Sequence, residues 1–473
     1  MKVTLAGYNI DNSLIQKLDN EAATPEVISA AYARISRSEK TVTELREEAL
    51  AELPKARKSN QTIVFEMGHA SVAEHAVFNF DIIGISRLLT ETLETLRFAS
   101  FTEKSQRYVT FSRDYLIPAE LEAPEHAELK VFYLEVMDAL FAEYEASFLA
   151  LKEYRSKGFP DFSKRDLEGM AKEDARYILP LSTKTQLGMT INARSLENLL
   201  RRLAESPLLE AHELHKTLLP QAKKVCPSLV RYVEPEFFPG GLPIPRELMD
   251  FETPDDDFWG QMIDQTNNSD NMVLASLFYE NSRSSWGKCL KYVNNLSDDE
   301  REKLWQQFFQ GIRPWSKMPR AFEMVDFHFE LRMSESCWAQ FKRHRVGTII
   351  RQKIPGVRTC IMPDIISRIG RESQWTQLLG KNTKLKKQLS TLNPDLARYA
   401  SLNGDPVWVL VKMNLREFYH LIRLRCDEHA QWEIRDLAGE MANQLRTKAP
   451  MATAFLCGKS DFDAVENLRN QKN

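Results

Sequence analysis

The chain has 473 residues, of which 43% are hydrophobic and 27% are charged, and its formal net charge at pH 7 is −3. This length exceeds that of a typical single domain, so two or more domains are expected. The nearly balanced charge argues against a general nucleic-acid or membrane-surface binder, which needs a strongly basic surface. Any anion-binding site must therefore be local.

The six cysteines lie far apart in the sequence and include no C-x-x-C pair. This spacing argues against a zinc site and against a disulfide framework, and it suits a reducing cytoplasm. The first residues lack a cationic segment followed by an apolar run, and no apolar stretch approaches the roughly 20 residues of a membrane helix. We therefore expect a soluble cytoplasmic protein without a metal site.

The first half of the chain contains two predicted strands, each followed by a predicted helix. The alternation in "EHAVFNFDI" (74–82) predicts a half-buried strand, and "SRLLTETLETLRF" (86–98) predicts the helix after it. A second strand is expected over "KTQLGMTIN" (184–192). Its last residue, Asn192, is a good N-cap for the helix "ARSLENLLRRL" (193–203).

The second half of the chain repeats this order of elements. Strands are expected over "EMVDFHFEL" (323–331) and "VWVLVKMN" (407–414), and helices over "SESCWAQFKRHR" (334–345) and "LREFYHLIRLR" (415–425). Asn414 stands at the N-cap of the last helix, as Asn192 does in the first half. Helices with hairpin-like strands and no repeated βαβ unit indicate an α+β class.

Further matches indicate that the two halves are tandem copies of one domain. The segment that begins at Val27, "VISAAYARISRS", matches "VLASLFYENSRSS" from Val273. "ARY" occurs at 175–177 and at 397–399, and each copy precedes an Asn-x-Arg by the same number of residues. Matches in the same order with nearly constant offsets indicate a duplication.

A segment rich in proline and glycine, residues 226–257, separates the two copies and ends in three aspartates. Such residues interrupt helices and strands rather than build them. We therefore predict a first domain over residues 1–225, a linker over 226–257 and a second domain over 258–473.

Arg343, His344 and Arg345 stand together near the end of a predicted helix. Cations interact favourably with the helix dipole there, so a solvated last turn is one interpretation. The other is a cradle for a phosphate or an electron-rich ring, because arginine supplies forked donors. The sequence does not decide between the two.

The segment "SFTEKSQRY" (100–108) also has two interpretations. Ser100-x-x-Glu103 fits a helix capping box, which the sequence favours in isolation. Alternatively, Glu103, Ser105 and Arg107 offer an acceptor, a hydroxyl and a guanidinium within one tight loop. That mixture suits the base edge and the phosphate of a nucleotide.

The segment "IRLRCDEHAQWEIR" (422–435) fits an amphipathic helix with Trp432 in the core. It also fits a site in which neighbouring carboxylates hold Arg425 in place. The chain contains no Gly-rich phosphate loop, no Ser-His-Asp order and no metal-ligand spacing.

Together these motifs resemble the flavin-dependent thymidylate synthase family. The family hallmark, RHRxxSxNExSxRY, follows a strand that carries Glu-His and precedes an N-x-R motif and a Gln-Trp-Glu helix. The resemblance covers most of both halves. It implies an α+β fold in two tandem copies, a homotetramer in the family, and FAD and dUMP sites that several subunits build.

The hallmark is divided between the two halves. The first half has Thr95-Leu96-Arg97 in place of RHR but keeps Ser100, Glu103, Ser105, Arg107 and Tyr108. The second half keeps Arg343-His344-Arg345 and departs from the hallmark at Thr348, Ile350, Arg351, Lys353 and Pro355. These complementary losses imply one composite site, which takes one side from each half, and a reciprocal site that is dead.

Carried over residue by residue, the resemblance implies a dUMP site formed by Gln340, Arg343, Arg398 and Arg425 with Glu103, Ser105 and Arg107. It implies an FAD site that includes Ser71, Glu103, Arg343, His344 and Arg345. The N-x-R contribution to FAD stays open between Asn192, Arg194 and Asn198, which match the family better, and Asn414, Arg416 and His420. The expected catalytic residues are Arg425 and Ser105.

The implied reaction is reductive methylation of dUMP to dTMP, with methylenetetrahydrofolate as carbon donor and NADPH as the reductant of FAD. A homodimer would supply the four domains that the family needs. Three alternatives stay open: the same fold acting on another pyrimidine nucleotide, a non-catalytic protein that binds flavin or nucleotide, and an RNA-binding protein. The slightly acidic total charge argues against RNA binding.

Overall fold

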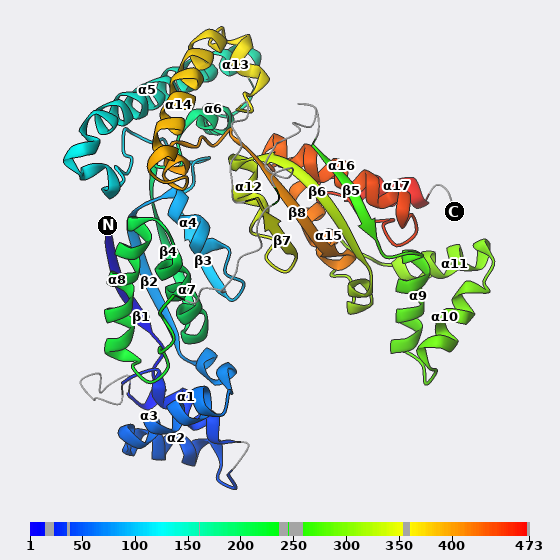
Figure 1. Cartoon of the computed structure of the whole chain (residues 1–473). Helices are drawn as coiled ribbons and strands as arrows, with labels where there is room; N and C mark the ends of the chain where they lie inside the picture. The colour runs from blue at the N-terminus through cyan, green and yellow to red at the C-terminus, as the bar shows by residue number, and fades with distance from the viewer. Residues whose placement is uncertain are drawn as a thin grey trace. The chain divides into compact units, whose positions relative to one another are not determined.

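The computed structural model describes residues 1–14, 23–35, 38–159, 161–235, 245, 259–352 and 360–470. The chain divides into two compact units (Figure 1). Unit 1 comprises Met1–Arg246 and Met362–Asn403, and unit 2 comprises Glu247–Ile361 and Gly404–Asn473. Each unit has its own sheet and its own hydrophobic core.

Unit 1 contains a four-stranded antiparallel sheet in the order β1-β2-β4-β3. Its strands are β1 (Lys2–Tyr8), β2 (Val77–Ser86), β3 (Ala99–Glu103) and β4 (Lys184–Asn192). Phe78 and Phe80 are fully buried, whereas Asn79 and Asp81 between them are exposed. The alternation that predicted β2 and β4 is therefore confirmed, because side chains of a strand alternate between its faces.

The helices of unit 1 that pack against this sheet are α4 (Arg87–Glu94), α7 (Ala193–Glu205) and α8 (Leu209–Val225). Asn192 caps α7 by accepting a hydrogen bond from the Ser195 amide at 2.8 Å, as the sequence predicts. Gln221 on α8 is tied to the backbone of β1, because it accepts from the Leu5 amide and donates to the Val3 carbonyl.

A small helical group near the N-terminus of unit 1 has a separate core. It consists of α1 (Glu26–Arg34), α2 (Val42–Ala51) and α3 (Leu53–Gln61), continued by the π-helical segment η3 (Thr62–Glu66) and the 3-10 helix η4 (Ala70–His75). Thr41 and Glu44 form a capping box at the start of α2. Through η4 this group reaches the end of the sheet that carries Asn192.

Unit 2 repeats the sheet of unit 1 in the equivalent order, β5-β6-β8-β7. Its strands are β5 (Gly260–Gln265), β6 (Asp326–Ser334), β7 (Thr348–Arg351) and β8 (Pro406–Asn414). The predicted alternation is confirmed here too, because Phe327 and Phe329 are fully buried in the core. The α+β prediction with two tandem copies therefore agrees with the two sheets.

The helices of unit 2 follow the same plan. Those that accompany the sheet are α12 (Glu335–Phe341), α15 (Leu415–Arg425), α16 (Trp432–Lys448) and α17 (Phe462–Asn470), with the turn η9 (Arg320–Met324). A lobe is formed by α9 (Ser269–Glu280), α10 (Trp286–Asn294) and α11 (Asp298–Phe309). Gln444 on α16 ties the backbone of β5 at Met262 and Gly260, as Gln221 ties β1.

A helical segment from the second half of the sequence packs inside unit 1. It comprises α13 (Asp364–Arg368), α14 (Glu372–Leu392) and η10 (Leu396–Ala400), and α14 lies against α5 (Ala127–Gly158), which also contacts α6 (Lys164–Ala175) (Figure 1). Trp375 is fully buried and donates to Ser147 Oγ at 2.9 Å. Arg371 binds both carboxylate oxygens of Glu143 at 2.6 Å.

The two copies of the "ARY" segment meet in unit 1 around an approximate twofold axis. Pro180 and Leu402 face each other in an antiparallel bridge, and they are separated in sequence by the same number of residues as Arg176 and Arg398. The Leu181 amide donates to the Ser401 carbonyl at 2.7 Å, and the Asn403 amide donates to the Leu179 carbonyl at 2.9 Å. This reciprocal pairing of equivalent residues is the pattern of a twofold dimer interface, found here within one chain.

The compact units differ from the limits predicted for the duplicated domains. Residues 362–403 belong to the predicted second domain (258–473) but pack in unit 1, because α14 buries Trp375 against α5. Burial of this kind cannot be read from repeats in the sequence. The limits 1–225, 226–257 and 258–473 stay a prediction about the duplication, and most of 226–257 lies outside the described residues.

Among the helices that the structure describes, none is both long and apolar enough to cross a lipid bilayer.

We predict that Trp375→Ala lowers the free energy of unfolding by about 3–5 kcal/mol, because it leaves a cavity between α14 and α5 and removes the hydrogen bond to Ser147 Oγ. Trp315 is 77% exposed and serves as the matched control; Trp315→Ala should change this free energy by less than about 0.5 kcal/mol. Denaturant unfolding measures both. Equal losses in the two variants would contradict the anchoring role of Trp375.

Candidate functional site

Unit 2 brings together side chains from the segment after α12 and from the end of α15. Arg425 donates from Nε to His344 Nε2 at 3.1 Å and from Nη2 to the Gln340 carbonyl at 3.0 Å. Three residues of the predicted dUMP and FAD sites, Gln340, His344 and Arg425, therefore lie in one cluster. We call the cluster of Gln340, Arg343, His344, Arg345 and Arg425 the unit 2 half-site.

The members of the Arg343-His344-Arg345 motif differ in burial. Arg343 is exposed and Arg345 is half-buried, whereas only 3% of His344 is exposed. Burial lowers the pKa of His344, although the nearby carboxylate of Glu417 acts in the opposite direction. The segment is therefore not a wholly solvated helix end: its central imidazole is buried, and Arg343 presents its charge to solvent.

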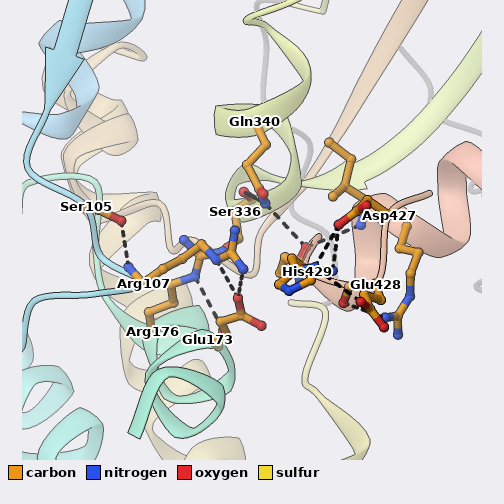
Figure 2. Close-up of polar contacts among 12 residues, drawn as sticks. Ser105, Arg107, Glu173, Arg176, Ser336, Gln340, Asp427, Glu428 and His429 are labelled. Carbon is orange, nitrogen blue, oxygen red and sulfur yellow. Dashed lines mark hydrogen bonds and ion pairs between the residues drawn. The ribbon is translucent and has the colours of Figure 1, made fainter. Parts of the chain in front are cut away.

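The unit 2 half-site is joined to the Gln-Trp-Glu segment. Gln340 Nε2 donates to Gln431 Oε1 at 3.4 Å, and the same oxygen caps α16 by accepting from the Ile434 amide. Figure 2 shows Gln340 on its helix and, in the loop that leads to α16, His429 beside Asp427, whose carboxylate is 3.0 Å from His429 Nδ1. This loop carries Asp427 and Glu428 next to Arg425 in the sequence, while Arg425 donates hydrogen bonds to His344 and the Gln340 carbonyl.

Unit 1 contains a second cluster, on the loop after β3. The Arg107 amide donates to Ser105 Oγ at 3.2 Å, and the Arg107 guanidinium forms an ion pair with Glu173 on α6. Figure 2 shows Arg107 extending toward Glu173 with Arg176 next to it. We call Glu103, Ser105, Arg107 and Arg176 the unit 1 half-site.

Arg176 is a member that the sequence analysis did not count as a site residue. It is 5% exposed, and its Nη2 has no hydrogen-bond partner among the described residues. Burial lowers its pKa, and the neighbouring Arg107 cation adds to this effect. Two guanidiniums this close, one of them desolvated, favour an anion between or beside them. The "ARY" repeat was the signal that could have identified Arg176.

Asn403 joins this loop to the Arg176 turn. Its Nδ2 donates to Gln106 Oε1 and to the Arg176 carbonyl, both at 2.9 Å, and it is 1% exposed. Gln106 lies between Ser105 and Arg107, so Asn403 fixes the backbone that presents both. A residue from the second half of the sequence thus supports a half-site of unit 1, which no local pattern could reveal.

Arg398 occupies a place different from the other second-half residues of the predicted dUMP site. It lies on η10 in unit 1, and its Nη1 is 3.7 Å from Asp395. Gln340, Arg343 and Arg425 lie in unit 2. The structure therefore groups Arg398 with Ser105 and Arg107, by unit, and not with the Arg-His-Arg segment.

Apart from Glu103 on β3, the first-half residues predicted to bind FAD gather where η4 meets α7. Ser71 on η4 is exposed, and Arg194 binds Glu74 at 2.6 Å while remaining half-exposed. Asn198 is exposed one helical turn after Arg194, so both side chains share one face of α7. Hydroxyl, amide and guanidinium donors on one surface fit the phosphates of FAD. Asn192 is occupied as the cap of α7.

The equivalent N-x-R motif of unit 2 is more enclosed. Arg416 donates from Nε to the Met318 carbonyl and from Nη1 to Glu323 Oε1, both at 2.7 Å. Asn414 caps α15 through the Glu417 amide. Both units thus keep an ion pair between the arginine of this motif and the glutamate before the strand: Arg194 with Glu74 and Arg416 with Glu323. The more exposed donors Arg194 and Asn198 favour the first-half set for FAD.

The hallmark Glu103 forms a buried ion pair that the sequence analysis missed. Its Oε1 is 2.7 Å from Nη1 of Arg87, and the two side chains are 5% and 9% exposed. Ser100 and Glu103 both lie in β3, so the capping-box interpretation is wrong: a strand has no N-cap, and the pairing of β3 with β4 decides the local structure.

Unit 2 has the same ion pair with its charges exchanged. Arg351, which occupies on β7 the place of Glu103 on β3, binds Glu335, which occupies the place of Arg87. The Arg351 Nη1 to Glu335 Oε2 distance is 2.9 Å, and the partners are 16 residues apart in both units. The loss of the hallmark glutamate in the second half is therefore matched by a change at its partner.

Comparison with known proteins gives the same assignment for both halves. A family model described as "Thymidylate synthase complementing protein" matches residues 16–228 and 261–451. The flavin-dependent thymidylate synthase of Clostridium tetani is 32% identical over 232 residues, which cover 48% of this chain and 89% of that protein. The UPF0159 protein Ta1429 of Thermoplasma acidophilum is 23% identical over 435 residues, covering 83% of this chain and 87% of that one.

Among solved structures, the flavin-dependent thymidylate synthase of Helicobacter pylori complexed with FAD and dUMP shares 22% sequence identity with this chain. The match covers 49% of this chain and 100% of that one, with a TM-score of 0.30.

We predict that Arg87→Glu lowers the free energy of unfolding by about 3–5 kcal/mol, because it places two carboxylates together in a buried site. The double variant Arg87→Glu, Glu103→Arg reproduces the charge order of unit 2 and should recover most of this loss. Exchanging the exposed pair Glu153–Lys157 in the same way is the control and should cost less than about 0.5 kcal/mol. If the free-energy losses of Arg87→Glu and Glu103→Arg, measured separately, simply added in the double variant, the pairing would be contradicted.

Proposed function

Because the chain belongs to the family of thymidylate synthase complementing proteins, we propose that it catalyses the FAD-dependent reductive methylation of dUMP at C5 to give dTMP. Methylenetetrahydrofolate would donate the carbon and NADPH would reduce FAD. The observation that supports this proposal most is the division of one set of site residues into two ordered half-sites. Each unit keeps the part that the other has lost.

The proposed nucleotide site takes Glu103, Ser105, Arg107 and Arg398 from unit 1 and Gln340, Arg343 and Arg425 from unit 2. To this set we add Arg176, because its buried guanidinium has an N–H group without a partner among the described residues. A nucleotide monophosphate carries a doubly charged phosphate and two carbonyl oxygens. Guanidinium groups match both, since they form charge-assisted hydrogen bonds in forked geometry.

Roles within the nucleotide site follow from what each residue contacts. Arg343 is exposed and Arg107 is held by Glu173, so each can meet a phosphate or carbonyl oxygen without a large rearrangement. Ser105 is held by the Arg107 amide and would position the base. Arg425, fixed by His344 and Gln340, would stabilise negative charge on the uracil ring ionised at N3, which makes C5 electron-rich.

The proposed flavin site takes Ser71, Glu103, Asn192, Arg194 and Asn198 from unit 1 with Arg343, His344 and Arg345 from unit 2. FAD, when bound, supplies the redox and carbon-transfer chemistry, while the protein binds and orients it. Since only one of the two copies keeps each part of the hallmark, we expect about one FAD per chain. We further propose a homodimer, which brings four domains together, and a cytoplasmic location, which suits the six free thiols.

The decisive experiment is mass spectrometry of dUMP after incubation with the purified protein, FAD, NADPH and methylenetetrahydrofolate. We expect the nucleotide to gain one methyl group. Bound FAD without any methylated product would overturn the proposed reaction and would favour a protein that binds flavin without this activity. Other pyrimidine nucleotides in the same assay test for a different substrate.

We predict that Arg425→Ala lowers kcat by about 10²–10³-fold, because it removes electrostatic stabilisation that develops at the reacting ring. Binding of dUMP, measured by calorimetry, should weaken less than the turnover. Arg446, an exposed arginine on α16, is the control, and Arg446→Ala should leave kcat unchanged. Unaltered turnover in Arg425→Ala would remove Arg425 from the mechanism.

We predict opposite sensitivities at the two copies of the first hallmark arginine. Arg343→Ala should abolish dUMP and FAD binding, because it removes a charged donor from the composite site. Thr95→Ala, at the equivalent position of the first half, should change turnover less than about two-fold, since the exposed Thr95 hydroxyl bonds to its own helix at Glu91 and to Arg202, both within unit 1. If Arg343→Ala and Thr95→Ala lowered the absorbance of bound FAD and the turnover to the same extent, a single composite site would be contradicted.

A further inference from the structure

Glu417 is a buried carboxylate beside the unit 2 half-site. It lies in the first turn of α15, where its amide donates to Asn414 Oδ1 at 2.9 Å, and it is 8% exposed. Its Oε1 is 3.4 Å from Nδ1 of His344. A carboxylate at this depth needs a charged or hydrogen-bonding partner, and the imidazole is the group that it faces.

The position of Arg425 fixes which nitrogen of His344 carries the proton. Arg425 Nε lies 3.1 Å from His344 Nε2, and a guanidinium N–H can only donate a hydrogen bond. Nε2 must therefore offer its lone pair. A neutral imidazole has one N–H, which is then on Nδ1, the nitrogen 3.4 Å from Glu417 Oε1. Nδ1 has no other hydrogen-bond partner among the described residues, so Glu417 is the acceptor within reach. The three groups form a sequence of carboxylate, imidazole and guanidinium.

The surroundings of His344 favour the neutral form of the ring. Burial is the main cause that lowers its pKa, and the cation of Arg425 and the nearby His420 act in the same direction. Glu417 opposes them and raises the pKa. The ring of Phe341, 6.3 Å away between centroids, adds an apolar neighbour. Protonation would place a hydrogen on Nε2 and turn the acceptor for Arg425 into a second donor.

We propose that Glu417 is a positioning residue that holds the proton of His344 on Nδ1, so that Nε2 accepts from Arg425 and orients its guanidinium toward the nucleotide. The part about the nucleotide rests on the proposed function, in which Arg425 contacts the base. In many enzymes a buried carboxylate orients a catalytic histidine in the same way. Here the imidazole orients the guanidinium of Arg425 and transfers no proton.

The first half of the chain supports this assignment because it lacks all three groups together. At the positions that correspond to Glu417 and Arg425, counted from the N-cap asparagine of each unit, it has Ser195 and Leu203. In the place of His344 it has Leu96. A set that is complete in one copy and absent as a whole from the other behaves as one functional unit.

The test begins with the tautomer, which can be read without turnover. Long-range ¹H–¹⁵N NMR of the full-length protein labelled at histidine should show His344 protonated on Nδ1, with the signal identified by its loss in His344→Gln. In Glu417→Gln the signal should move toward the Nε2-protonated form. The control is Glu433→Gln, which alters another buried carboxylate of unit 2, bonded to Ser334, and should leave the His344 signal unchanged.

Kinetics and binding then separate positioning from a merely structural role. We expect Glu417→Gln to lower kcat about ten-fold, equivalent to about 1.4 kcal/mol of transition-state stabilisation, with KM for dUMP changed less. Because Glu417 raises the pKa of His344, its loss should move the acid limb of the pH profile to lower pH. Glu417→Asp should restore part of kcat, and unfolding midpoints check that the variants are folded.

Two results would overturn the proposal: a wild-type His344 protonated on Nε2, or a Glu417→Gln variant with the wild-type tautomer and acid limb. The proposed reaction can fail separately. If the tautomer depends on Glu417 and dUMP binding weakens in Glu417→Gln, yet no methylated nucleotide forms in the wild type, then the positioning role is supported and the reaction is not.

Discussion

The fold depends on the burial of residues 362–403, a segment of the second half, inside unit 1. Trp375 is enclosed against α5, Arg371 is neutralised by Glu143, and the Tyr399 hydroxyl donates to the buried carboxylate of Glu210 at 2.9 Å. The chain leaves unit 2 at Ile361 and returns at Gly404, so two further backbone connections join the units besides the one after Arg246. The sheet core of each unit comes from its own half of the sequence, whereas the packing of α5 in unit 1 is completed by α14 from the second half.

Both units retain the interactions that build the scaffold while they differ in the side chains proposed for function. A serine ends the central strand of each sheet and is bound by a buried glutamate: Ser86 by Glu210, and Ser334 by Glu433. Gln221 and Gln444 tie the edge strands in the same manner. These contacts satisfy backbone groups that would otherwise be buried without partners, so their loss would be costly in either copy. Exposed functional positions such as Thr95 and Arg343 carry no such penalty and are free to diverge, whereas Glu103 is held in a buried ion pair.

The sequence predicted much of this arrangement where the signal is local. Alternating apolar residues predicted β2 and β6 and the asparagine caps predicted the starts of α7 and α15, because both patterns depend on a few neighbouring residues. The family resemblance is confirmed by a match over both halves. What the sequence did not reveal is non-local: the packing of α14 on α5, the support that Asn403 gives to Gln106, and the place of Arg398 in unit 1. Each depends on contacts between residues far apart in the chain.

The exchanged ion pair explains how the second copy could lose the hallmark glutamate and still hold its half-site. In unit 1 the pair joins the first residue of α4, Arg87, to the last residue of β3, Glu103, and so closes the loop between them. Glu335 and Arg351 join the ends of the equivalent segment in unit 2, which runs from the start of α12 to the end of β7. Residues 340–345 lie within this segment, at the end of α12 and before the start of β7. A single charge reversal would have left two like charges buried at its base. The two reversals together keep the loop closed, so the Arg-His-Arg segment stays ordered in a copy that has given up the rest of the motif.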